Sequence, residues 1–255
     1  MADRISNLRV KIFSDSADQA SILELACQPW IKGFTTNPTL MRKAGVSDYE
    51  SFGRQLTRRI PDRPFSFEVL SNDFTEMEQQ ALRIASWGEN VYVKIPITDT
   101  YGQSSAPLVE RLARQGVKVN VTAIMTLPQV DAVLGSLRDG PPSYISIFAG
   151  RIADAGVDPL PILRGALARI YDHPQIEVIW ASPRELFNIL QADNIGCHII
   201  TVTPDLLKKL PSIGKDLTQY SLETVKMFVE DARAAGFALE IADRTQPNEL
   251  IPAEH

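Results

Sequence analysis

Eight short apolar runs alternate with helical segments along the chain, and this alternation limits the possible folds more than any other feature of the sequence. Strands are expected near residues 8–14, 30–36, 65–70, 91–96, 117–123, 143–148, 176–181 and 198–203. Repeated β–α alternation over 255 residues is typical of the α/β class. The pattern predicts a parallel (β/α)8 TIM barrel, with a doubly wound open sheet as the main alternative.

The segments between these runs carry helical signals. Apolar residues recur at helical spacing in residues 74–84 and again in residues 222–232. Residues 126–129 and 182–185 have the composition of capping boxes, and Pro38 fits the first turn of a helix. These signals predict several helix starts directly after strands.

No proline-rich or serine-rich linker divides the chain, so we expect one domain. This domain, residues 1–243, would contain the barrel and an additional C-terminal helix. That helix could pack on its own barrel or on a neighbouring subunit, which leaves a homo-oligomer open. Residues 244–255 are polar and are expected to form a flexible tail.

The charge balance argues against several classes of partner. The formal net charge is −5 and the pI is about 5.3, so the chain lacks the basic footprint of a protein that binds nucleic acid or an anionic membrane. No apolar run reaches transmembrane length, and the first ten residues hold no signal-peptide core. A cytoplasmic protein is therefore expected.

Cysteines and histidines form no pattern typical of a metal site. Cys27 and Cys197 lie far apart in the sequence and are expected to be reduced core residues, and the three histidines share no ligand spacing. The chain also has no GxGxxG or Walker lysine motif. We therefore expect neither a metal nor another cofactor.

One lysine lies within an apolar strand. Alternation places Val91, Val93 and Ile95 on one face and Tyr92 and Lys94 on the other. An arbitrary lysine in this setting usually extends its ammonium into solvent. If the group is buried instead, desolvation favours the neutral amine, which can attack a carbonyl carbon.

Polar residues gather at the ends of several predicted strands. In the fifth strand, Val119 and Val121 share one face while Asn120 and Thr122 share the other. The residues that fall toward C-terminal strand ends are Asp15, Glu68, Lys94, Asn120, Thr122 and Ser146. Barrel enzymes build their active sites on this face, so these side chains are expected to line one pocket.

Taken singly, most of these residues have a structural explanation. Asn37 and Ser182 could simply cap helices, and Thr122 could be an ordinary strand residue. Arg151 and Arg184 could be surface charges, although Arg184 in the first turn of a predicted helix would oppose the helix dipole and so indicates a nearby anion. Only the joint pattern indicates a site.

Five short motifs together carry a family resemblance: residues 34–39 (FTTNPT), 93–96 (VKIP), 119–123 (VNVTA), 148–152 (FAGRI) and 181–184 (ASPR). In this order, each at a strand end, they resemble those of the transaldolases, including the compact fructose-6-phosphate-aldolase-like branch. The resemblance implies a cofactor-free (β/α)8 barrel of class I aldolase type that acts on sugar phosphates.

The resemblance also implies roles for individual residues. Lys94 corresponds to the Schiff-base lysine, Asp15 to the general acid and base, and Glu68 with Thr122 to the pair that holds a catalytic water. The implied substrate-binding residues are Thr35, Asn37, Asn120, Ser146 and Phe148, together with Arg151, Ser182 and Arg184 at the phosphate.

The implied reaction moves a dihydroxyacetone unit from fructose 6-phosphate or sedoheptulose 7-phosphate to an aldose phosphate such as erythrose 4-phosphate. Two alternatives stay open: an aldolase that releases dihydroxyacetone, and a barrel that binds sugar phosphates without catalysis. Phe148 favours transfer, because the aldolase-like branch carries a tyrosine at this position. Pro183, Ala153 and the loop at residues 99–101 depart from the usual pattern and could alter substrate length.

Overall fold

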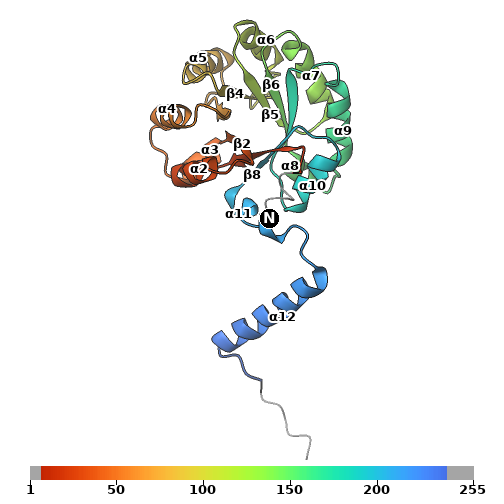
Figure 1. Ribbon diagram of the computed structural model, residues 1–255. Helices are drawn as coiled ribbons and strands as arrows, with labels where there is room; N and C mark the ends of the chain where they lie inside the picture. Colours follow the sequence, from red (N-terminus) through yellow and green to blue (C-terminus); the bar gives the residue numbers. More distant parts are fainter. Residues whose placement is uncertain (1–6, 240–255) are drawn as a thin grey trace, which may run out of the picture. The chain divides into compact units, whose positions relative to one another are not determined.

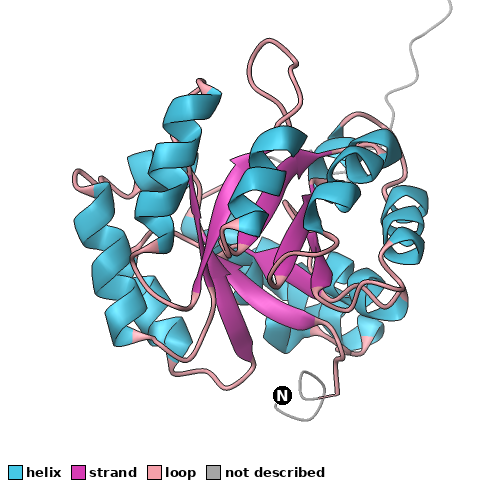
Figure 2. Cartoon of the chain, turned by 90° about the horizontal axis from the view of Figure 1, so that it is seen from above, coloured by secondary structure: helices cyan, strands magenta, loops and turns pink. Residues whose placement is uncertain are grey.

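The predicted barrel is confirmed by a computed structural model, which describes residues 7–239. Eight parallel strands close in the order β1-β2-β3-β4-β5-β6-β7-β8, and β8 pairs with β1. Figure 2 shows these strands at the centre of the molecule with helices around them. The strands are β1 (Lys11–Asp15), β2 (Ile31–Thr35), β3 (Phe65–Glu68), β4 (Val91–Pro96), β5 (Val119–Ile124), β6 (Ser143–Ile147), β7 (Ile176–Trp180) and β8 (Ile199–Val202).

Helices follow each strand, as Figure 1 shows. They are α2 (Gln19–Ala26), α3 (Pro38–Lys43), α4 (Tyr49–Arg59), α5 (Phe74–Ala85), α6 (Ala106–Arg114), α7 (Leu127–Leu137), α8 (Ala149–Asp154), α9 (Leu160–Arg169), α10 (Phe187–Asn194), α11 (Pro204–Leu207), the 3-10 turn η1 (Leu210–Ser212) and α12 (Leu217–Ala234).

Two of the predicted helix starts are confirmed and one is wrong. Thr126 and Gln129 form a capping box at the start of α7, and the Asn37 side chain caps α3, whose first residue is Pro38. Residues 182–185 form no capping box, because α10 begins only at Phe187. Arg184 therefore precedes the helix and does not oppose its dipole.

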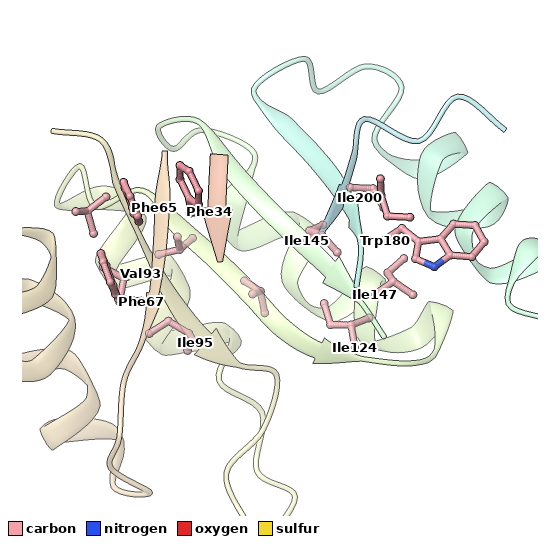
Figure 3. Packing of buried hydrophobic residues seen from close by; sticks show 14 of the residues in the cluster. Phe34, Phe65, Phe67, Val93, Ile95, Ile124, Ile145, Ile147, Trp180 and Ile200 are labelled. Atoms are coloured by element: carbon pink, nitrogen blue, oxygen red, sulfur yellow. The ribbon is translucent and has the colours of Figure 1, made fainter. Parts of the chain in front are cut away.

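The main core lies between the barrel and its helices. Most outward side chains of the strands are apolar and buried, as Val93 and Ile95 illustrate on β4. Phe34 and Phe65 stack with ring centroids 4.9 Å apart, and Phe67 stacks on Phe65 at 5.8 Å (Figure 3). This packing confirms the strand parity that the sequence predicts, so the alternate residues point toward the barrel axis.

Aromatic rings fill the barrel interior on the N-terminal side of the polar residues. Tyr92 and Tyr144 stack with centroids 4.0 Å apart, and Phe13 meets Tyr144 edge to face at 6.0 Å. A Cβ atom at Gly33 would lie 2.6 Å from the Phe13 ring, so only glycine leaves space for it. Each of these rings lies two residues before an inward polar residue on the same strand. The rings therefore form the layer of the barrel interior directly below the polar residues.

The chain divides into two compact units, Met1–Ile213 and Gly214–His255. The second unit contains α12, which Asp216 caps and in which no side chain is buried. Its predicted apolar stripe is exposed, with Val225 53% and Val229 44% accessible. The single domain of residues 1–243, the packing of this helix and a homo-oligomer stay predictions, and residues 244–255 lie outside the described part.

Two further expectations concern single residues and segments. Cys27 is exposed, so its assignment to the core is wrong, because it lies at the solvent-facing end of α2. Cys197 is buried, and this burial raises the pKa of its thiol to about 12. Within residues 7–239, every helix is too short or too polar to span a membrane.

Candidate active site

Lys94 lies near the C-terminal end of β4 with its side chain inside the barrel. Its Nζ donates to the backbone carbonyl of Thr36 at 2.8 Å and to the carboxylate of Glu68 at 3.0 Å. Only 7% of the Lys94 side chain is accessible. The ammonium is thus held in place by neighbouring segments of the barrel and does not extend into bulk solvent.

Strand register brings Glu68 to the lysine. The β3–β4 ladder pairs Glu68 directly with Lys94, so both side chains point inward at the same height. The Tyr49 hydroxyl donates to the backbone carbonyl of Glu68 at 2.8 Å and fixes the end of β3. Burial raises the pKa of this phenol, which therefore stays protonated and keeps donating.

Asp15 ends β1 beside these two residues and is partly accessible through the cavity. The Thr35 hydroxyl donates to its Oδ1 at 2.8 Å. Burial raises the pKa of Asp15, while the charge of Lys94 and the Thr35 hydrogen bond oppose this shift and the charge of Glu68 adds to it. A carboxyl with a raised pKa is suited to exchange protons near neutral pH.

A second polar layer lies beneath the carboxylates. Asn120 is fully buried, and its amide donates to Ser66 Oγ at 3.0 Å while its Oδ1 accepts from Ser146 Oγ at 2.7 Å. Asn120 does not line the cavity, so it reaches the cavity surface only through Ser146. Its predicted contact with substrate stays a prediction.

The backbone of β5 is irregular near its end, at Thr122 and Ala123. Ala123 has a φ of 61°, and the β5–β6 register shifts between Val121 and Ile124. The Thr122 hydroxyl is buried and finds no hydrogen-bond partner among the described residues. A positive φ in a residue other than glycine is strained by roughly 1–3 kcal/mol and is often found at functional sites.

Two arginines, Arg151 and Arg184, also line the cavity. The Arg151 guanidinium lies 5.9 Å from the centroid of the Phe148 ring. Arg184 donates through Nε to Asp154 Oδ1 at 2.9 Å, through Nη2 to Asp154 Oδ2, and through Nη1 to Ser182 Oγ at 2.9 Å. Two cations and a hydroxyl suit an anion such as phosphate.

Ser182 has a constrained backbone. Its φ is 60°, and its carbonyl oxygen would lie 1.6 Å from a Cβ atom at Gly150. Glycine is therefore required where α8 passes the loop after β7. This close approach brings the start of α8, which carries Arg151, to the segment that carries Arg184.

These side chains share one cavity of about 480 Å³ at the C-terminal end of the barrel. All predicted site residues except Asn120 line it, together with Pro38, Thr39, Leu40, Ala123, Ala181 and Thr201. Every strand contributes a residue from its C-terminal half or from the position directly after it: Asp15, Thr35, Glu68, Lys94, Thr122, Ser146, Ala181 and Thr201.

Sequence reasoning missed five residues that shape this site: Thr36, Tyr49, Ser66, Asp154 and Thr201. Strand parity could have found Ser66 and Thr201, because both share the inward face of their strands. The carbonyl of Thr36 and the pairing of Asp154 with Arg184 have no signal in the sequence.

The arrangement combines an amine, two carboxylates and a site for an anion within one cavity. A primary amine can form an imine with a ketone, and an imine accepts electrons from a breaking carbon–carbon bond. The two carboxylates provide separate positions for proton transfer.

A family model described as Transaldolase/Fructose-6-phosphate aldolase matches residues 12–244. A protein from Thermoanaerobacter sp. named "Probable transaldolase" is 34% identical over 232 residues, which cover 90% of this chain and all of that protein. A protein from Dehalococcoides mccartyi with the same name is 33% identical over 202 residues, or 79% of this chain and 90% of its own length.

The similarity of this chain to solved structures extends only to the fold. A crystal structure of KGPDC from Streptococcus mutans has a TM-score of 0.51 at 9% identity and covers 77% of this chain and 88% of its own. A structure of 2,3-dimethylmalate lyase has a TM-score of 0.50 at 11% identity and covers 96% of this chain and 90% of its own.

Proposed function

The chain belongs to the transaldolase/fructose-6-phosphate aldolase family, and from this premise we propose that it transfers a dihydroxyacetone unit between sugar phosphates through an imine on Lys94. The donor is a ketose phosphate such as fructose 6-phosphate or sedoheptulose 7-phosphate, and the acceptor is an aldose phosphate such as erythrose 4-phosphate. The observation that carries this proposal is the buried Lys94 amine, 3.0 Å from Glu68 in a cavity that also contains Asp15.

In the first step, Lys94 Nζ attacks the ketone carbon of the donor. The Lys94 ammonium first gives one proton to Glu68, and the attacking nitrogen then passes a second proton to the carbonyl oxygen, which gives a carbinolamine. Glu68 returns its proton to the carbinolamine hydroxyl, which leaves as water and gives a protonated imine. The hydroxyl of Thr122 has no partner among the described residues and lies in the same cavity as Glu68. Together these groups can hold the water that is released and later used for hydrolysis.

In the second step, the Asp15 carboxylate takes the proton from the hydroxyl on the carbon that departs. The bond between the third and fourth carbons breaks, its electron pair moves into the imine to give an enamine, and the shortened aldose leaves as an aldehyde. Addition of a new aldehyde reverses these movements, and Asp15 returns the proton. The imine of Lys94 is the electron sink, so the proposal assigns no role to a cofactor.

Specificity for phosphorylated sugars is assigned to Arg151, Ser182 and Arg184. Arg184 already uses Nε and Nη2 on Asp154, while its Nη1 donates to Ser182, which also lines the cavity. Guanidinium and hydroxyl groups are common phosphate donors.

The second candidate is an aldolase that releases dihydroxyacetone. The two reactions differ only in whether the enamine is protonated or captured by an aldehyde. Phe148 lines the cavity and has no hydroxyl to hold a proton-donating water, which favours transfer. Phe148→Tyr should raise the share of released dihydroxyacetone, and an unchanged product ratio would argue against this assignment.

The proposal is tested by incubating the protein with fructose 6-phosphate and borohydride, followed by intact mass measurement and peptide mapping. We expect a reduced adduct on Lys94 that is missing from Lys94→Ala. Lys118→Ala is the matched control, because Lys118 precedes β5 and binds the carbonyl of Glu89 away from the cavity. An adduct that persists in Lys94→Ala would refute the proposal. Addition of erythrose 4-phosphate then distinguishes transfer to this aldehyde from release of dihydroxyacetone.

A further inference from the structure

A chain of hydroxyl groups leads from Asp15 across two neighbouring strands. Thr35 Oγ1 on β2 donates to Asp15 Oδ1 at 2.8 Å and lies 2.5 Å from Thr201 Oγ1 on β8. Both threonines are buried, with 4% and 5% of their surface accessible, and both line the cavity. Since Thr201 is on β8 and Thr35 on β2, the chain spans β1 from both sides.

Strand register explains why these groups meet. Asp15 pairs directly with Thr35 in the β1–β2 ladder, while Thr201 pairs with Phe13 in the β1–β8 ladder. All these positions point toward the barrel axis. The Thr201 hydroxyl thus reaches Thr35 from the layer just below Asp15.

Counting protons fixes the direction of these hydrogen bonds. An ionised carboxylate only accepts, and a hydroxyl has a single proton to give. When Thr35 gives its proton to ionised Asp15, it has none left for Thr201. Thr201 must then donate to Thr35.

We propose that Thr201 is a positioning residue of this site, whose hydroxyl donates to Thr35 and thereby commits the only proton of Thr35 to the Asp15 carboxylate. This inference rests on the proposed function, because it concerns the proton transfer assigned to Asp15 during bond cleavage. Hydrogen bonds in series polarise one another, so donation by Thr201 strengthens the bond from Thr35 to the carboxylate.

The same chain reverses when Asp15 takes up a proton from the substrate. Protonated Asp15 can donate to Thr35, which then donates to Thr201, so two hydroxyl groups turn with each transfer. The charged groups that also face Asp15 are Lys94 and Glu68. Within the described part of the chain, Thr201 forms a hydrogen bond with neither of them, so its influence passes through Thr35.

The test compares Thr201→Val, which keeps the shape and removes the hydroxyl, with Thr201→Ser, which keeps the hydroxyl. The readout is the pH dependence of kcat/KM for transfer from fructose 6-phosphate to erythrose 4-phosphate. Loss of the Thr201 donor destabilises the charged form of Asp15, so the acidic limb of Thr201→Val should move to higher pH by roughly 0.3–1 unit. The limb of Thr201→Ser should stay in place, and Thr201→Ala is the second hydroxyl-free variant should the valine not fold.

A double-variant comparison tests whether Thr201 acts through Thr35. Thr35→Val alone should shift the limb at least as far, and adding Thr201→Val should shift it no further. An unmoved limb in Thr201→Val, a uniform loss of rate at every pH, or additive shifts in the double variant would each overturn the inference.

The borohydride adduct separates this inference from the proposed function. Thr201→Val should still form the adduct on Lys94, because imine formation uses Glu68 and not Asp15. A wild-type adduct together with an unmoved limb overturns only the role of Thr201. Absence of the adduct from the wild-type protein overturns the proposed function and this inference with it.

Discussion

Replacing Gly33 with alanine should strain the aromatic layer beneath the candidate active site. The added Cβ would lie 2.6 Å from Cε2 and Cζ of Phe13 and 2.8 Å from its Cε1, well inside van der Waals contact. Phe13 is 1% accessible and packs edge to face on Tyr144, so its ring has no free space to move into. The clash must therefore be relieved by distortion of the barrel interior.

The expected cost follows from two opposing effects. Overpacking a core by one methyl group costs roughly 1–3 kcal/mol. Loss of glycine freedom in the unfolded chain offsets about 0.4–1 kcal/mol of this. A net loss of about 1–2 kcal/mol corresponds to a fall in Tm of roughly 2–8 °C at this chain length.

Thermal and denaturant unfolding of a double-variant cycle would measure this effect. Phe13→Leu alone should lower the free energy of unfolding, because it leaves a void. The double variant should lose about 1 kcal/mol less than the sum of the two single variants, because the methyl group of Gly33→Ala fills part of that void. Gly135→Ala is the matched control: Gly135 lies in α7 with nothing within 4 Å of an added Cβ, so this change should stabilise by up to about 1 kcal/mol. Additive penalties, or an unchanged Tm for Gly33→Ala, would refute the reasoning.

Three further outcomes are expected. The raised pKa of Asp15 means that the folded chain binds this proton more tightly than the unfolded chain, so stability falls as the pH rises from the ordinary value of 3.8 through the folded pKa. Asp15→Asn should therefore have a higher Tm than the wild-type protein at pH 7, and this difference in Tm should shrink toward pH 4. A difference that grows at low pH would contradict the raised pKa of Asp15. Asp154→Ala should raise KM for a phosphorylated donor by roughly 5–30-fold with little change in kcat or Tm, because an exposed ion pair adds little to stability but orients Arg184. Asp154→Asn, which keeps an acceptor oxygen, should fall between, whereas a lowered KM in steady-state assays would mean that Asp154 competes with phosphate. Gly150→Ala should unfold at a lower temperature than Gly33→Ala, because its Cβ would meet the backbone carbonyl of Ser182 and not a side chain; equal melting curves would show that this loop can move aside.

The fold could be predicted from the sequence because each strand carries its own signal. Outward residues such as Val93 and Ile95 are β-branched and apolar, and the alternation with helices recurs throughout residues 11–202. The start of α10 could not be predicted. Residues 182–185 have the composition of a capping box, but Ser182 adopts a positive φ and the backbone N–H of Arg184 binds the side chain of Asn188.

The candidate site could be predicted to the extent that it follows strand parity. Parity places Asp15, Glu68, Lys94 and Thr122 on the inward face at the same end of their strands, and the structure brings them to one cavity. Strand parity does not predict hydrogen bonds between loops, so the pairing of Arg184 with Asp154, 30 positions earlier, could not be predicted. Parity also places Asn120 on the inward face, but it does not predict the hydrogen bonds to Ser66 and Ser146 that hold its amide.

Because all eight strands contribute to the cavity wall, either directly or through the residue that follows, the site is complete only while the ring is closed. Opening the barrel between β8 and β1 would part Thr201 from Asp15, and separating β3 from β4 would part Glu68 from Lys94. The half made of β1 to β4 carries Asp15, Glu68 and Lys94 but lacks Thr122 on β5 and the arginines that follow β6 and β7, so fragments of this chain should be inert until they reassemble. Formation of the borohydride adduct on Lys94 during refolding would then measure when the barrel closes, as well as whether the imine forms.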